Sequence, residues 1–349
     1  MGLFGLGAIA GAFIGGRITD KFGFYQVQVT SLLLGGIMFI AVGYLHTFTS
    51  LAIGTFILSL CNESFRPANA TAIAFYSKPE NRTRSYSLNR LAINLGWAVG
   101  GALGGFLASV NYHLLFWVDG CTNILAAFLL LKLLPYVKSG TKHATEKHAP
   151  AGRSAYKDKI YVSFIFLTIL FAACFFQLFT ILPVFYKTQW HLNEQFIGLL
   201  MALNGLIIVF IEMVLVYSLE GTKPLTSFIR IGVLLVGAGY ALHNIFPSTG
   251  WAAVLCITIM TIGEILSMPF MNSFWIRRTT ETNRGQYAGM YTIAWSIAQI
   301  AAPTLGSQVV QHAGYNILCW VLAGICLLSS AGFTLLGIRI NNSKTEFAS

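Results

Sequence analysis

Long apolar stretches separated by short polar joints run through the whole chain. Each stretch is long enough to cross roughly 30 Å of hydrocarbon as a helix of about 20 residues. Because lipid cannot satisfy backbone N–H and C=O groups, a stretch that crosses it has to be helical. Eleven such stretches are expected, at 3–20, 26–46, 50–77, 85–110, 113–134, 160–186, 194–218, 225–246, 249–276, 286–311 and 315–338. They predict an all-α, polytopic membrane protein.

Charged residues make up 10% of the chain, against about 25% in soluble proteins, which excludes an ordinary soluble enzyme. The net charge is +10, but Lys and Arg lie in short joints rather than on one solvated face, so no nucleic-acid partner is expected. They fall on alternate joints, which predicts a cytoplasmic carboxyl terminus and an external Met1. The sequence contains no metal-ligand cluster, nucleophile–base arrangement or phosphate loop, so neither a cofactor nor an enzyme activity is predicted.

The joint at 135–159 is long, polar and basic, and it divides the stretches into five before and six after. We therefore expect an N-terminal helical bundle over 1–134, a cytoplasmic linker over 135–159 and a C-terminal bundle over 160–349. A shift of 202 residues superposes matching residues of the two halves. The pairs are Asn81-Arg82 with Asn283-Arg284, Pro67 with Pro269, Gly104 with Gly306, and Gly35 with Gly237.

Two parallel half-repeats of this kind are a transporter architecture. On this register the stretch at 160–186 would have its partner before Met1. The repeat thus predicts eleven spans of an expected twelve, with the first helix absent. A bundle without one helix has an open cavity wall, so a transport-inactive membrane protein is one alternative.

The joint after the first stretch reads Gly16-Arg17-Ile18-Thr19-Asp20-Lys21-Phe22-Gly23. It resembles the loop between helices 2 and 3 of the major facilitator superfamily, with Phe24 and Tyr25 where that family usually has two basic residues. The resemblance implies a gate loop of Gly16, Asp20, Lys21 and Gly23 in which the aspartate helps to close the cytoplasmic side. A carboxylate at the positive end of a neighbouring helix is stabilised by its dipole and free N–H groups.

Glycine runs mark two further stretches. Gly96, Gly100, Gly104 and Gly105 stand in a segment that is similar to a glycine-rich run on helix 5 of drug:proton antiporters of this superfamily, although Gly101 replaces the proline. The same spacing is also typical of plain helix packing, because small residues let backbones approach closely. Gly7, Gly11 and Gly15 are interpreted as such a packing face.

Five charged residues are expected inside the membrane, where each costs about 2.5–3.5 kcal/mol and requires a reason. Glu264 has no basic residue near it along its own helix, so we interpret it as an isolated acid that exchanges protons. Glu63 is a second proton-coupling candidate, and Arg66, three residues on, can share its helix face. That pair is either self-neutralising or exposes Arg66 to a substrate cavity. Asp119 and Glu212 are also cavity candidates, with a structural role equally open.

The expected function is secondary transport by alternating access, powered by protons, with export of drug-like or metabolite solutes. The alternative is proton-coupled import of small peptides or similar zwitterions, because Phe65-Arg66-Pro67 and Gly263-Glu264 resemble short motifs of proton-coupled peptide transporters. The expected partners are a small-molecule substrate, protons and the lipid bilayer. We expect a monomer in a bacterial inner (cell) membrane.

Overall fold

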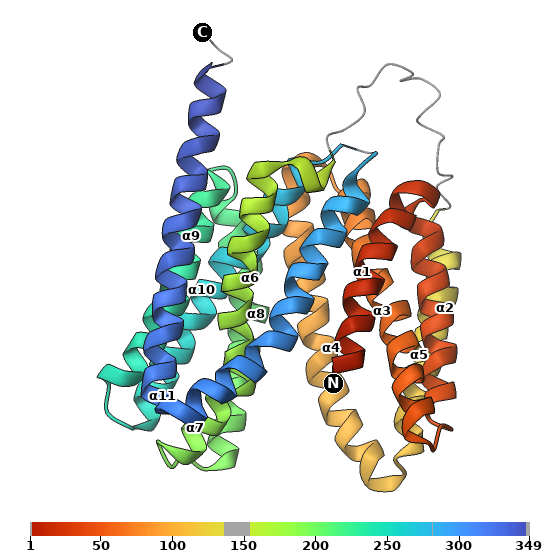
Figure 1. Cartoon of the computed structure of the whole chain (residues 1–349), viewed down its shortest axis with the longest axis horizontal. Coiled ribbons are helices and arrows are strands. Elements are labelled where there is room, and N and C mark those ends of the chain that lie inside the picture. The colour runs from red at the N-terminus through yellow and green to blue at the C-terminus, as the bar shows by residue number, and fades with distance from the viewer. Residues whose placement is uncertain (1, 136–153, 281, 347–349) are drawn as a thin grey trace. The chain divides into compact units, whose positions relative to one another are not determined.

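The computed structural model describes residues 2–135, 154–280 and 282–346. These residues contain eleven α-helices, two short 3₁₀ helices (Pro79–Asn81 and Ala155–Lys157) and no β-strand (Figure 1). The α-helices are α1 (Gly2–Phe22), α2 (Phe24–Val42), α3 (Phe48–Tyr76), α4 (Arg82–Val110), α5 (His113–Leu133), α6 (Lys159–Thr180), α7 (Leu182–Thr188), α8 (Glu194–Leu219), α9 (Leu225–Ile245), α10 (Gly250–Ile276) and α11 (Arg284–Glu346). Most of the expected linker, at 136–153, lies outside the described residues.

The helices follow the apolar stretches closely, and the all-α fold class is confirmed. The stretch at 160–186 is divided into α6 and α7, with Ile181 between them. The last two stretches form α11, which is broken at Gly314, whose φ of 84° favours glycine because it has no Cβ. Eight helices of the described part have the length and apolar composition to cross a membrane: α2, α3, α5, α6, α8, α9, α10 and α11.

The chain forms two compact units. Unit 1 comprises Met1–Pro79, Gly96–Asp158 and Arg278–Ile297, and unit 2 comprises Glu80–Leu95, Lys159–Arg277 and Ala298–Ser349. Compared with the two bundles expected from the sequence, the beginnings of α4 and of α11 are exchanged between the units. Both helices therefore contribute residues to each unit.

Unit 1 is built on close packing of α1 against α3. A Cβ added at Gly7, Gly11 or Gly15 would collide with the backbone of α3, at Phe56, Leu60 and Ser64 respectively. The Ser64 hydroxyl donates a hydrogen bond to the Gly11 carbonyl at 3.0 Å across the same contact. The packing face predicted for these three glycines is confirmed.

Unit 2 is built on α10, which packs against α9 and α8. Gly232 of α9 and Gly263 of α10 meet backbone to backbone, and an added Cβ at either would overlap the other's carbonyl. Farther along, the rings of Phe164 and Phe274 stack with centroids 4.5 Å apart. This dense packing gives the polar residues of α8 and α10 fixed positions.

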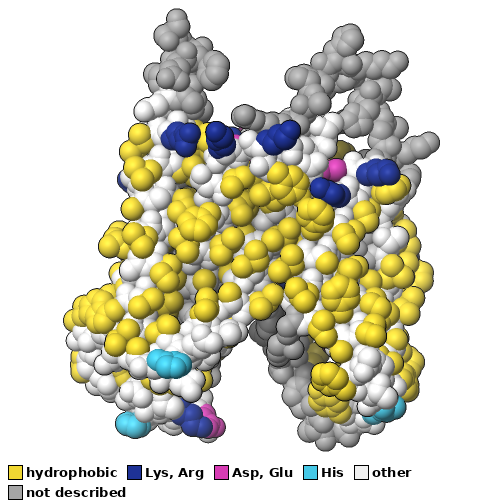
Figure 2. Space-filling model, viewed as in Figure 1, with side chains coloured by type: hydrophobic (Ala, Val, Ile, Leu, Met, Phe, Trp, Pro, Cys, Tyr) yellow, Lys and Arg dark blue, Asp and Glu magenta, His cyan; other side chains and the backbone are white. Residues whose placement is uncertain are grey.

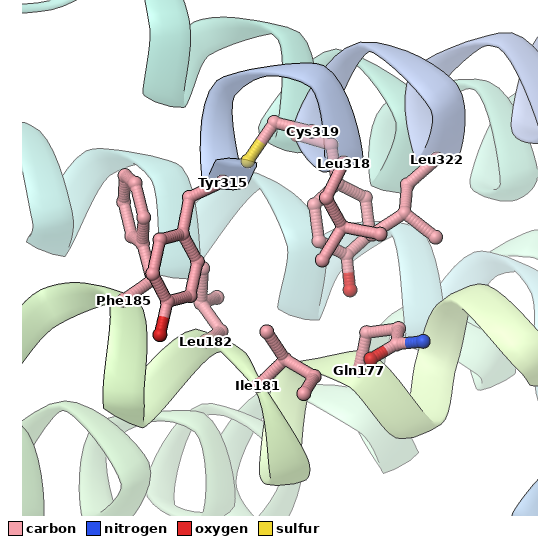
Figure 3. A pocket seen from close by; sticks show the side chains of 9 residues that line it. Gln177, Ile181, Leu182, Phe185, Tyr315, Leu318, Cys319 and Leu322 are labelled. Carbon is pink, nitrogen blue, oxygen red and sulfur yellow. The ribbon is translucent and has the colours of Figure 1, made fainter. Parts of the chain in front are cut away.

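A small pocket in unit 2 lies among α6, α7, α9 and the second part of α11 (Figure 3). It is lined by Gln177, Ile181, Leu182, Phe185, Tyr240, Tyr315, Leu318, Cys319 and Leu322. None of these side chains carries a charge, and the Gln177 amide nitrogen donates a hydrogen bond to the Ala302 carbonyl at 2.6 Å. The buried charged side chains of α8 and α10 do not line this pocket.

Candidate functional site

A buried cluster of polar and charged side chains lies where α4, α8 and α10 meet within unit 2. We call it the charge cluster, and its members are Arg90, Asn204, Glu212, Thr261 and Glu264. Thr261 and Glu264 are three residues apart on α10 and therefore share a face of that helix. Asn204 and Glu212 lie about two turns apart on α8. Arg90 reaches them from the first half of α4.

Arg90 bridges the two carboxylates of the cluster. Its Nη1 lies 2.9 Å from Oε2 of Glu212, and its Nη2 lies 2.9 Å from Oε2 of Glu264. Nη1 is also 3.4 Å from the backbone carbonyl oxygen of Glu264. One guanidinium is thus shared between acids on two different helices.

The other oxygen of Glu264 is held by α8. Asn204 Nδ2 donates to Glu264 Oε1 at 3.0 Å and to the Thr261 hydroxyl at 2.9 Å. Thr261 in turn donates to the backbone carbonyl of Ile257 at 2.8 Å. Glu264 therefore has a fixed orientation that does not depend on Arg90.

The cluster is almost completely removed from solvent. Glu212 and Glu264 are each 1% exposed, and the Arg90 side chain is 12% exposed. With all three groups ionised the cluster has one positive and two negative charges, and an unbalanced charge in a low-dielectric interior is costly. The cluster becomes neutral when the two carboxylates share one proton, and such a proton belongs to the pair rather than to one residue.

The prediction that Glu264 is an isolated acid is wrong, because Arg90 and Asn204 both contact it. Arg90 was not among the predicted site residues, although it lies inside the expected stretch 85–110. Its partner Glu264 is 174 positions away in the sequence. A complete count of charges within the stretches would have found it. No periodicity in the sequence, however, links α4 to α10.

The second predicted pair is present in unit 1. Arg66 Nε lies 2.8 Å from Oε2 of Glu63, so the expected contact within α3 is confirmed. Glu63 is buried, whereas the Arg66 side chain is 53% exposed. Asp119 is exposed on α5. The substrate-cavity roles of Arg66 and Asp119, and the proton-coupling role of Glu63, stay predictions.

Asp20 caps the amino terminus of α11 within unit 1. The Gly285 N–H donates to Asp20 Oδ1 at 2.5 Å, and the Gln286 N–H donates to Oδ2 at 2.8 Å. Free N–H groups and the positive end of the helix dipole both favour a carboxylate at this place. We call this contact the α1–α11 latch. The contact has the geometry expected from the gate-loop motif, in which a carboxylate lies at the positive end of a neighbouring helix.

Glycines allow the latch to form. A Cβ on Gly16 would lie 2.5 Å from the Gly285 carbonyl oxygen, and one on Gly285 would overlap the Gly16 carbonyl. Gly23, the residue before α2, has a φ of 93°, which favours glycine. Lys21 is exposed, and its ammonium lies 5.2 Å from the centroid of the Phe22 ring. Lys and Arg side chains gather at one end of the helices in each unit (Figure 2).

The end of the expected linker supports the same part of α11. Arg278 donates to both carboxylate oxygens of Asp158 at 2.9 Å, and the Tyr287 hydroxyl donates to Asp158 Oδ2 at 3.0 Å. Asp158 is 4% exposed. Tyr287 follows Gln286 directly, so Asp158 helps to fix the helix end that receives Asp20.

The glycine run of α4 does not form a comparable contact at its first two positions. A Cβ added at Gly96 or Gly100 would meet nothing within 4 Å in the part of the chain that the structure describes. Side-chain surroundings are not described for Gly104 and Gly105. The antiporter and packing interpretations of this run therefore both stay predictions.

We expect Asp20→Asn to open the α1–α11 latch. The change removes the charge and one of the two acceptors, and hydrogen bonds to charged groups contribute about 1.5–3 kcal/mol. The latched population should fall roughly ten- to hundredfold relative to the open one. The readout is labelling of a cysteine introduced at Thr19, which is 3% exposed, by a membrane-impermeant maleimide. Lys21→Gln, an exposed change in the same loop, is the matched control, and equal labelling of both variants would contradict the prediction.

Comparison with known proteins agrees with this architecture. The family described as Major Facilitator Superfamily matches residues 1–303. A Na⁺, Li⁺, K⁺/H⁺ antiporter of Planococcus maritimus is 24% identical, with 94% of this chain and 84% of the relative covered. The multidrug resistance protein MdtH of Aeromonas hydrophila is also 24% identical, with 94% and 81% covered.

Solved structures show the same fold. The structure of a proton:xylose symporter of the major facilitator superfamily, bound to a bromodeoxyglucose, superposes with a TM-score of 0.74. The sequence identity is 15%, and the match covers 95% of this chain and 83% of the symporter. At that identity the likeness concerns the fold alone.

Proposed function

The chain belongs to the major facilitator superfamily, and we propose that it is a proton-coupled exporter of drug-like or metabolite solutes that works by alternating access. It is an integral, multi-pass membrane transporter, and the proposal adds the driving ion, the direction and the substrate type. Relatives named as a cation/H⁺ antiporter and a multidrug resistance protein support both the coupling and the solute type. We place it in a bacterial cell membrane as a monomer.

The observation that supports the proposal most directly is that the charge cluster contains two carboxylates but one guanidinium. Glu212 and Glu264 are both buried, and among the described residues the cation that bridges them is Arg90. Intramembrane acids are expensive, and in transporters they mark ion and proton pathways. The pair therefore supplies a place at which a proton is held in one state of the cycle and released in another.

Charge balance explains how the proton and the solute are coupled. While the carboxylate pair holds one proton, Arg90 balances the remaining charge and the cluster is neutral. After the proton leaves, the cluster is negative in a low-dielectric environment, and a positive partner is favoured there. Glu264 is the first candidate for the proton carrier because Asn204 and Thr261 fix its orientation, and Glu212 shares the proton with it.

The residues of unit 1 have other proposed roles. Asp20 closes the basic end of the bundle through the α1–α11 latch, which breaks when that end opens. Arg66 and Asp119 remain candidates for contacts with the solute. The partly exposed Arg66 also supports the alternative, import of small peptides, because an exposed guanidinium can bind a peptide carboxylate.

The test uses the full chain in proteoliposomes with an imposed pH gradient. We expect a lipophilic dye to accumulate against its gradient while protons move the other way, and an ionophore that collapses the pH gradient should abolish this. Uptake of a dipeptide driven by an inward proton gradient would favour the alternative. If neither solute moves when the gradient is applied, the proposed function is wrong and a transport-inactive protein remains.

A further inference from the structure

We infer that the Arg90 guanidinium occupies the place of a transported cation, and that the solutes of this protein carry a flat guanidinium or amidinium group. The inference rests on the proposed function and names the substrate class of the same site. It follows from the acceptors that surround Arg90, from their independence of Arg90, and from the position of this residue on α4.

Three acceptors surround the guanidinium. They are Oε2 of Glu212 at 2.9 Å, Oε2 of Glu264 at 2.9 Å and the backbone carbonyl of Glu264 at 3.4 Å. The two carboxylate oxygens contact different nitrogens of the planar guanidinium. We call these three acceptors the cradle, because they suit a ligand whose N–H groups diverge in one plane. A cation without N–H groups would balance the negative charge of the cradle but would donate no hydrogen bond to its acceptors.

The cradle is built without Arg90. Glu212 lies on α8 and Glu264 on α10, helices that pack against each other. Asn204 of α8 donates to Glu264 Oε1 at 3.0 Å and so fixes one carboxylate from the helix that carries the other. When Arg90 leaves, Glu264 keeps its hydrogen bond from Asn204, and Glu212 stays on the adjacent helix. They are then buried without a counter-ion, which favours another cation or protons in its place.

One acceptor of the cradle is unused. Glu212 is 1% exposed, and the Ser87 side chain of α4 also contacts its carboxylate. Neither carboxylate oxygen has a hydrogen bond of full geometry from the described residues. Oε2 has the ion pair with Arg90, so Oε1 is a buried acceptor with capacity to spare. A free guanidinium or amidinium that is not tethered to α4 can orient its N–H groups toward both oxygens. Unsatisfied buried acceptors of this kind favour a ligand that donates to them.

Arg90 is placed on the segment that a transport cycle can move. Residues Glu80–Leu95 of α4 belong to unit 2, and the rest of the helix belongs to unit 1. Of the three helices that meet in the charge cluster, α4 is the one whose residues are divided between the units. When Arg90 withdraws, the cation of the transported solute takes the place of its guanidinium in the cradle.

The experiment compares two cations of equal charge that share a phenyl ring. Benzamidine has four N–H bonds in one plane, and phenyltrimethylammonium has none. By calorimetry, we expect the purified full chain in detergent to bind benzamidine at least tenfold more tightly than phenyltrimethylammonium. Glu264→Gln should lower that affinity about tenfold, whereas Glu194→Gln, at an exposed pair with Lys187, should leave it unchanged.

A second measurement separates the site from general binding. In Arg90→Ala the internal competitor is absent, so benzamidine should raise the melting temperature of this variant more than that of the unaltered protein. Arg84→Ala, on the same helix and at the Glu220 pair, is the control and should respond like the unaltered protein. If Arg90→Ala cannot be purified, the calorimetric comparison of the two cations decides alone.

Equal binding of the two cations, or an equal response of the two arginine variants, would overturn the inference. Proton-driven transport of dyes or peptides without benzamidine binding would also overturn it while the proposed function stands. Benzamidine binding without any proton-driven flux would contradict the proposed function instead. The two proposals therefore fail in different ways.

Discussion

Glu264→Gln should abolish proton-driven accumulation and leave the protein folded. The glutamine keeps the shape of the side chain and an oxygen that accepts from Asn204 or Arg90. Arg90 then faces Glu212 alone, so the cluster is neutral without a proton and has none to exchange. Accumulation in proteoliposomes should fall to the level of protein-free vesicles, while the unfolding free energy changes by about 1 kcal/mol or less. Downhill solute exchange should continue.

Glu194→Gln is the matched control for this prediction. Glu194 is paired with Lys187 at 2.5 Å, but its side chain is 76% exposed. Exposed ion pairs contribute about 0–1 kcal/mol, so neither stability nor transport should change. If Glu264→Gln still concentrates solute in a pH-dependent way, Glu264 is not the proton carrier. The role would then pass to Glu212 or Glu63.

The helices were predictable because each depends on a local property of the sequence. Apolar length and polar joints placed eight of the α-helices, α1 to α5 and α8 to α10, one to each expected stretch. They missed the division of one stretch into α6 and α7. The stretches at 286–311 and 315–338 were expected as separate helices, and the break of α11 at Gly314 lies between them.

The α1–α11 latch was predictable for a different reason. Asp20 stands in a loop whose pattern of glycines and charges resembles that of a known family, and the amino terminus of a helix supplies donors whatever its sequence. The Gly285 and Gln286 N–H groups are backbone donors. A side chain that depends on backbone groups can be placed by motif alone.

The charge cluster was not predictable as a cluster. Its members come from three helices, and Arg90 is separated from Glu264 by 174 positions. Each acid was found by its cost in lipid, but the partner of each depends on which faces of α4, α8 and α10 meet. The Glu63–Arg66 pair was found because both residues lie on one turn of α3. Local pairs follow from helix geometry, and distant pairs require the packing.

Arg90→Ala should destabilise the protein far more than Arg66→Ala. Arg90 bridges two carboxylates that are 1% exposed, and removing one partner of a buried ion pair costs about 3–5 kcal/mol because a charge stays buried without compensation. The Arg66 side chain is 53% exposed and pairs with a single carboxylate, that of Glu63, so the cost of removing it should be smaller. Total stabilities are about 5–15 kcal/mol. Arg90→Ala should therefore lower the yield and the melting temperature in detergent clearly.

The cause of that loss can be separated from simple loss of packing. If the uncompensated carboxylates are responsible, Glu212→Gln and Glu264→Gln added to Arg90→Ala should restore much of the stability, because replacing a whole buried ionic cluster by neutral groups is often nearly neutral. If the long side chain of Arg90 acts mainly by filling space, the triple variant should remain as unstable as Arg90→Ala. Equal melting temperatures of Arg90→Ala and Arg66→Ala would contradict the buried charge cluster itself. The triple variant should regain its melting temperature but not proton-driven transport. That result would show that these three side chains contribute both to the stability of unit 2 and to proton coupling.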